Sequence, residues 1–146
     1  MDFSSQNHEE VYLRIKKMMM ELFGEAGAIT YEDSPGWMVP SGSAMVHVSV
    51  NSWRDGEMHL IQIVSFVAQG TELTPGCLRY LLDENHQMAF GGFSIDSDGD
   101  IAFSHSLIAE TCSKEELKTV VMAMSGTADE QDDTIVQRWG GKRAQD

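Results

Sequence analysis

The stretch FGGFSIDSDGDIAFSH (Phe90–His105) sets three aspartates around one glycine, between two segments of alternating apolar residues. Asp98-Gly99 is a dipeptide typical of a tight hairpin turn. The alternation predicts two paired strands with Phe93, Ile95, Ile101 and Phe103 on one face. Asp96 and Asp100 then face water near the turn. This hairpin indicates an antiparallel sheet.

A calcium loop is the main alternative for the same three aspartates. Asp96, Asp98 and Asp100 match the first three oxygen positions of an EF-hand loop. The sixth position, however, is Ile101 instead of glycine, and the twelfth is Leu107 instead of glutamate. Strand-like alternation also flanks the loop, where an EF-hand has helices. We therefore expect neither a metal site nor a catalytic carboxylate pair here.

Helices are predicted on both sides of this hairpin. Thr74 caps a helix that begins with Pro75, and we expect its buried side to be Leu78, Leu81 and Leu82. Ser113 and Glu116 have capping-box spacing, so a last helix starts there and runs toward Trp139. Its expected core-facing stripe is Leu117, Val120, Val121, Met124 and Ala128.

The first half of the chain is predicted as one helix followed by strands. Apolar residues at three- and four-residue steps indicate a helix over about 8–24. A short strand over 28–33 follows, and Pro40 is expected to break its continuation at 37–39. Residues 43–53 and 58–68 are two arms of a hairpin. Both faces of 58–68 are apolar, which is typical of a central strand covered on both sides.

The fold class that follows is α+β. We expect an antiparallel sheet of about five strands packed with three helices, in the order α-β-β-β-α-β-β-α. The length of 146 residues fits a single domain over 1–146. About 8–139 is expected to be ordered, with 1–7 and 140–146 as loose tails.

The composition of the chain limits the classes of partner that it can bind. Hydrophobic residues make up 42% of the chain, and the net charge is −13. A chain this acidic is a poor ligand for nucleic acid or an anionic membrane, and it suits a basic or amphipathic partner better. Three features of the sequence predict a cytoplasmic protein. The start MDFSSQNHEE is polar, no apolar run has the length of a membrane span, and the two cysteines are interpreted as reduced thiols.

Few residues are candidates for chemistry. His47 and His59 could face each other across the 43–53/58–68 hairpin, but two ligands make a poor metal site. Cys77 lies near a helix N-terminus, which can activate a thiol, although a buried thiol is the simpler interpretation. We expect no enzyme, no catalytic residue, no metal and no cofactor.

Methionines and tryptophans are the candidate partner-binding residues. Met18, Met19 and Met20 run together on the first predicted helix, so at least one of them is expected to be exposed. Methionine-rich surfaces adapt to apolar segments. Trp37 and Met38, in a predicted loop, and Trp53 complete the predicted set of contact residues.

The segment ENHQMAFGGFSIDSDGDIAFSHSLIAETCSKEEL (84–117) resembles the YbjN family and the wider type III secretion chaperone-like fold. The residues that carry this resemblance are Asn85, Phe90, Gly91, Phe93, Asp98, Gly99 and Leu117. It implies a secretion chaperone-like fold, a homodimer, and a surface that holds an extended or amphipathic segment of a partner protein. The alternative implied role is a regulatory small-ligand-binding domain, a sensory-transduction regulator.

Overall fold

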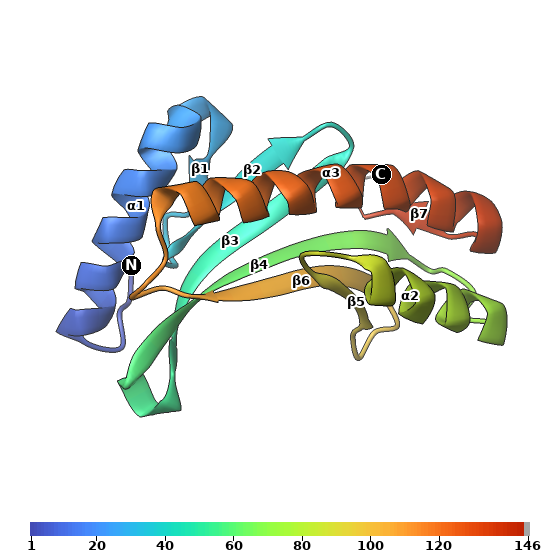
Figure 1. The fold of residues 1–146 in the computed structure, drawn as a ribbon, viewed down its shortest axis with the longest axis horizontal. Helices are drawn as coiled ribbons and strands as arrows, with labels where there is room; N and C mark the ends of the chain where they lie inside the picture. The colour runs from blue at the N-terminus through green and yellow to red at the C-terminus, as the bar shows by residue number, and fades with distance from the viewer. Residues whose placement is uncertain (145–146) are drawn as a thin grey trace.

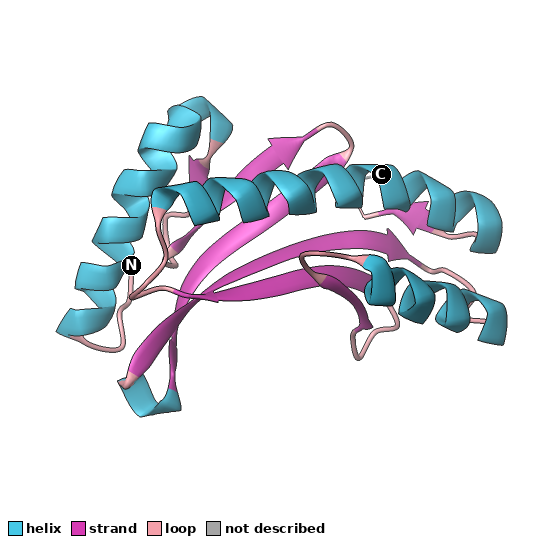
Figure 2. Cartoon of the chain, in the orientation of Figure 1, coloured by secondary structure: helices cyan, strands magenta, loops and turns pink. Residues whose placement is uncertain are grey.

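The computed structural model describes residues 1–144, which form an antiparallel sheet with three helices (Figure 1). The elements, coloured by class in Figure 2, are α1 (Gln6–Gly27), β1 (Ile29–Thr30), β2 (Gly36–Ser41), β3 (Ala44–Trp53), the 3₁₀ turn η1 (Arg54–Gly56), β4 (Met58–Gln69), α2 (Pro75–Gln87), β5 (Gly92–Ile95), β6 (Ile101–Ile108), α3 (Lys114–Trp139) and β7 (Lys142–Arg143). The predicted α+β class is confirmed. The sheet has seven strands rather than about five, and β1 and β7 are too short to give a sequence pattern.

Strand β4 lies at the centre of the sheet. The order is β1-β2-β3-β4-β6-β5, and β7 pairs with the end of β4. The β5–β6 hairpin pairs Phe93 with Phe103 and Ile95 with Ile101, as the alternation predicts. Pro40 does not break β2, contrary to expectation. It follows the two residues that pair with β1, on an edge where the ring's missing N–H is tolerated.

Side-chain caps fix where the helices begin. The Thr74 hydroxyl accepts a hydrogen bond from the Cys77 N–H, and the Ser113 hydroxyl accepts one from the Glu116 N–H. Both caps were predicted from spacing. Helix α1 begins at Gln6, two residues before the expected start, because Ser5 caps it by accepting from the His8 N–H. Helix α3 extends to Trp139 as expected.

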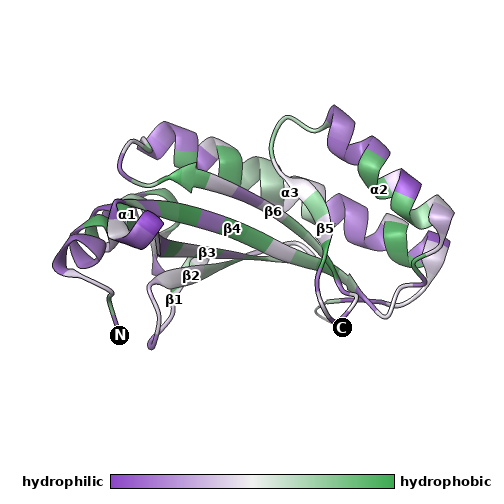
Figure 3. Cartoon of the chain, turned by 90° about the horizontal axis from the view of Figure 1, so that it is seen from below, coloured by the Kyte–Doolittle hydropathy of each residue, from purple (hydrophilic) through white to green (hydrophobic). Residues whose placement is uncertain are grey.

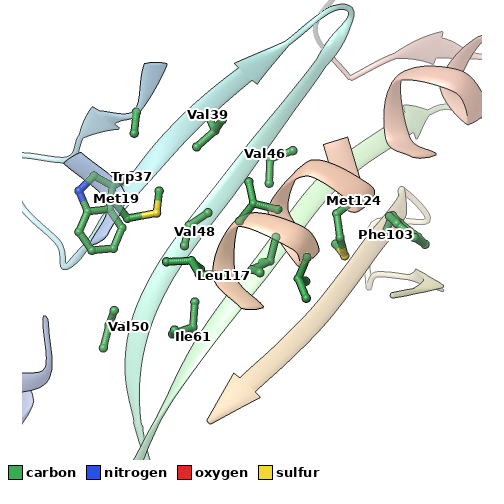
Figure 4. Close-up of a cluster of buried hydrophobic side chains, with 14 of the residues drawn as sticks. Met19, Trp37, Val39, Val46, Val48, Val50, Ile61, Phe103, Leu117 and Met124 are labelled. Atoms are coloured by element: carbon green, nitrogen blue, oxygen red, sulfur yellow. The ribbon is translucent and has the colours of Figure 1, made fainter. Parts of the chain in front are cut away.

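The core lies between the sheet and helices α1 and α3 (Figure 4). Trp37 is fully buried, and its ring stacks on Tyr12 of α1 at 5.2 Å between centroids. Its neighbours in the core include Met19, Val39, Val46, Val48, Val50, Ile61, Phe103, Leu117 and Met124. One continuous apolar layer therefore joins both helices to β2, β3, β4 and β6.

Both chain ends expected to be loose make contacts. Phe3 packs against Tyr12, with 5.3 Å between ring centroids. Strand β7 pairs with Ala68 and Gln69 of β4. Gly141 has φ 86°, and a Cβ there would lie 2.3 Å from the Gln69 carbonyl oxygen, so only glycine fits this turn. Residues 145–146 of the expected tail lie outside the described residues.

None of the helices in residues 1–144 is long and apolar enough to cross a membrane.

Candidate functional site

The two faces of the sheet differ in what covers them. In β4 the buried residues His59, Ile61 and Ile63 alternate with partly exposed ones. Viewed from below, α2 and α3 lie on one side of the strands (Figure 3). Helix α1 packs on the same side, where Tyr12 stacks on Trp37, and no helix of residues 1–144 covers the other side. The expectation that both faces of 58–68 are covered is therefore wrong. The chain covers one face and leaves the other apolar face to solvent.

We call the uncovered side the open face. Strand register brings its residues together, because Met38 pairs with His47 and His47 pairs with Val64. Phe66 and Ile108 are 39% and 45% exposed. The open face consists of Met38, Met45, His47, Leu60, Val64, Phe66 and Ile108, with Ser49, Asn51, Gln62, Ser104 and Ser106 between them. Two of its apolar side chains are thus exposed, and the others are partly exposed.

The strands that form this face carry no formal charge from acidic or strongly basic side chains. Strands β2 to β6 contain no Asp, Glu, Lys or Arg. An antiparallel sheet with one solvated face normally alternates apolar residues inside with polar ones outside. Here Asn51 donates to Ser49 and Gln62, so even the polar residues bond to one another. Burying such a surface against a partner therefore costs little desolvation free energy.

His47 is the one titratable residue of the open face. Burial lowers its pKa below the usual histidine value, so the imidazole is neutral at pH 7. Its Nδ1 forms a hydrogen bond with the Tyr31 hydroxyl, and the two rings stack with 6.1 Å between centroids. The open face is therefore uncharged at neutral pH.

The predicted cross-strand pairing of His47 with His59 is wrong. His47 lies opposite Val64, whereas His59 lies opposite Ser52 on the covered face. The His59 Nδ1 is 2.7 Å from a Glu110 carboxylate oxygen, and its ring stacks on His8 at 5.3 Å. His59 is fully buried, so this cluster joins α1 to the sheet beneath it.

The predicted partner-binding residues divide between the surface and the core. Met38 is part of the open face, and Trp53 is 42% exposed at the end of β3, with the Arg54 guanidinium 4.4 Å from its ring centroid. Trp37, by contrast, is fully buried, so its expected exposure is wrong. It belongs to a strand and not to a loop, and alternation turns it to the covered face.

The three consecutive methionines of α1 also separate. Met19 is fully buried, whereas Met18 and Met20 are partly buried at the margin of the core. None of the three is exposed, contrary to the expectation that at least one of them is. They do not belong to the open face, which lies on the other side of the sheet from α1.

A second accessible apolar surface was missed from the sequence. Leu78 and Leu82 of α2 were expected to be buried, but they are 39% and 66% exposed. With Ile95 of the edge strand β5 they line a shallow hollow of about 290 Å³. We call Leu78, Leu82 and Ile95 the α2–β5 surface. Cys77 and Leu81 form the buried side of α2 instead.

Asp96 and Cys77, which were also considered for chemistry, have structural roles. One Asp96 carboxylate oxygen accepts from the Asp98 and Asp100 N–H groups, each at 2.9 Å, and so closes the predicted turn. Cys77 is fully buried, and burial raises the pKa of its thiol. A raised pKa makes a thiol less reactive at neutral pH, which favours the buried-residue interpretation.

Known proteins resemble this chain in sequence profile and in fold. Residues 9–146 match the family described as T3SS (YopN, CesT) and YbjN peptide-binding chaperone 1. The structure of the HopA1-SchA chaperone-effector complex contains a chain with a TM-score of 0.62 and 12% identity, covering 85% of this chain and 97% of that one. A chain of the ExsC-ExsE complex has a TM-score of 0.62 and 14% identity, covering 85% and 95%. A search of curated protein sequences finds no significant match.

Proposed function

Because this chain belongs to the family of T3SS (YopN, CesT) and YbjN peptide-binding chaperones, we propose that its open face binds an apolar segment of a partner protein. The protein acts by binding and not by catalysis, in the cytoplasm. The observation that carries the proposal is the sheet itself, with accessible apolar side chains and no Asp, Glu, Lys or Arg in strands β2 to β6.

Physical chemistry supports this use of the open face. Contiguous exposed apolar residues are uncommon on monomers and mark interaction sites. Fully burying an exposed phenylalanine side chain yields about 1.5–3 kcal/mol, and Phe66, which is 39% exposed, can gain a part of that against a partner. Unbranched Met38 and Met45 adapt to different partner shapes. Since His47 is neutral, a partner does not have to desolvate a charge.

Capture from the source organism's extract tests this proposal. The bait is compared with two variants, Phe66→Ser on the open face and Met122→Ser on the exposed side of α3. Both exchange an exposed apolar residue for serine, and Met122 lies outside both proposed surfaces, so the second is a matched control for the first. We expect one stoichiometric partner that is retained by the wild type and by Met122→Ser and lost with Phe66→Ser. Equal retention by both variants would contradict the proposed site.

We further propose that the protein is a homodimer in which two copies bury their α2–β5 surfaces. A two-fold interface uses the same residues twice, and α2 is suited to this because Arg79 and Asp83 flank its exposed leucines with opposite charges. Leu82→Glu should then convert the dimer to a monomer in sedimentation equilibrium. Phe66→Ser should remain dimeric, and a wild-type monomer at high concentration would refute the interface.

A further inference from the structure

The charges of this protein are distributed unevenly around the open face. Strands β2 to β6 contain none of its acidic residues, so the acidic side chains near this face lie in the loops at the two strand ends. At the hairpin end these are Glu32, Asp33, Asp55 and Glu57, and at the opposite end they are Glu72, Asp96, Asp98 and Asp100.

The basic residues near these loops are fewer than the acidic ones. Arg54 stacks on Trp53 at the hairpin end. At the opposite end, Lys142 is part of β7, and Arg143 is 3.5 Å from Asp133 of α3. Both ends of the open face are therefore net negative, with an uncharged apolar centre between them.

From this arrangement we infer that the partner segment is an amphipathic helix whose apolar side lies on the open face and whose ends carry lysine or arginine. This inference rests on the proposed function and names the chemistry of the partner. The negative potential at each end of the open face attracts a basic end of the segment and so holds the segment along the strands, while the uncharged centre supplies apolar contact.

The dimensions of the strand set the length of that helix. Leu60 and Phe66 are six positions apart on β4, which is about 20 Å at roughly 3.4 Å per residue. A helix rises 1.5 Å per residue, so about 14 residues cover this distance. Apolar side chains at three- and four-residue steps then form one continuous stripe, and basic residues in the first and last turns reach the acidic loops.

Two synthetic peptides of about 14 residues test the inference. They share one leucine stripe and differ only in their remaining positions, which are lysine in one and glutamate in the other. Binding of each fluorescein-labelled peptide to the full-length protein is measured by fluorescence anisotropy at low and at high salt. We expect the lysine peptide to bind roughly tenfold more tightly at low salt and to lose that advantage at high salt.

Variants locate the binding. Phe66→Ser should weaken binding of the lysine peptide. The matched control Met122→Ser, which removes an exposed apolar side chain of α3 outside both proposed surfaces, should leave that binding unchanged. Asp55→Asn combined with Glu57→Gln should lower the affinity for the lysine peptide by roughly threefold and leave the affinity for the glutamate peptide unchanged, since the apolar contacts remain.

Each contrary outcome has a distinct meaning. Equal affinity of both peptides, with both dependent on Phe66, would overturn the inferred charge and leave the open face as the binding site. Lysine-peptide binding that is independent of Phe66 would also overturn the inference, because the attraction would then be to the acidic chain as a whole. Failure of both peptides to bind in a Phe66-dependent way would count against the open face itself.

Discussion

Trp37 and Met38 are neighbours in the sequence, yet replacing each by alanine should have very different effects on stability. Trp37 is fully buried and stacks on Tyr12, whereas Met38 is half-buried on the open face. Truncating a buried tryptophan to alanine typically costs about 3–5 kcal/mol, because transfer and cavity terms add. For Met38 we expect a smaller cost, about 1 kcal/mol, since its side chain is only partly buried and its truncation leaves no enclosed cavity.

The expected cost at Trp37 is large compared with the stability of a domain. Native domains are stable by about 5–15 kcal/mol in total, so Trp37→Ala should remove a third or more of this in most of that range. At this chain length, 1 kcal/mol corresponds to roughly 2–4 °C in Tm, which predicts a loss of roughly 10 °C. Far-UV circular dichroism during urea and thermal unfolding measures both variants without relying on tryptophan fluorescence.

The pair of variants also tests the assignment of the two faces. A shift of strand register by one residue would exchange the positions of Trp37 and Met38. If Met38→Ala cost several kcal/mol while Trp37→Ala cost little, β2 would present the opposite side to the helices. The open face, and the proposal that depends on it, would then be wrong.

Three further predictions concern titratable groups. Burial raises the pKa of Asp132, whose carboxylate oxygen is 2.7 Å from the Ser43 hydroxyl oxygen. Protonated Asp132 therefore stabilises the fold, and this contribution is complete at pH values below the ordinary aspartate pKa of about 3.9. It is lost as the pH rises through the higher pKa of the folded state. Asp132→Asn should remove this pH dependence from urea midpoints and be more stable than the wild type at pH 8, and an unchanged profile would refute the assignment. Burial raises the pKa of Cys112 to about 11, so we expect slow reaction with Ellman's reagent in the native protein and fast reaction in guanidinium; immediate native labelling would contradict it. Because protonated His47 would charge the open face, affinity for the partner should fall as pH drops below about 6.5, and His47→Gln should abolish that fall in titration calorimetry.

Local signals predicted the framework of the fold because each acts over a few residues. The Thr74 and Ser113 caps, the Asp98-Gly99 turn and the alternation around it all appear in the structure as expected. These features depend on spacing alone. The sequence indicates a loop around Trp37 because Pro40 follows it closely, although an edge strand accommodates proline and β2 continues to Ser41.

The open face could not be recognised from the sequence for a different reason. Apolar residues on both sides of β4 indicate that both sides are covered, but the pattern is the same whether a helix of this chain or another molecule covers them. Only the placement of all three helices on one side of the sheet distinguishes the two cases. Leu78 and Leu82 were misassigned similarly, since their helical spacing also fits the buried side of α2.

Photo-crosslinking from the open face tests the central claim most directly. A benzophenone amino acid replaces Phe66 in one protein and Leu82 in a second, and each is irradiated with the captured partner. The account predicts that position 66 crosslinks to one short segment of the partner, whereas position 82 crosslinks to a second copy of this chain. Crosslinks to the partner from position 82 alone would contradict it, because the α2–β5 surface would then be the binding site.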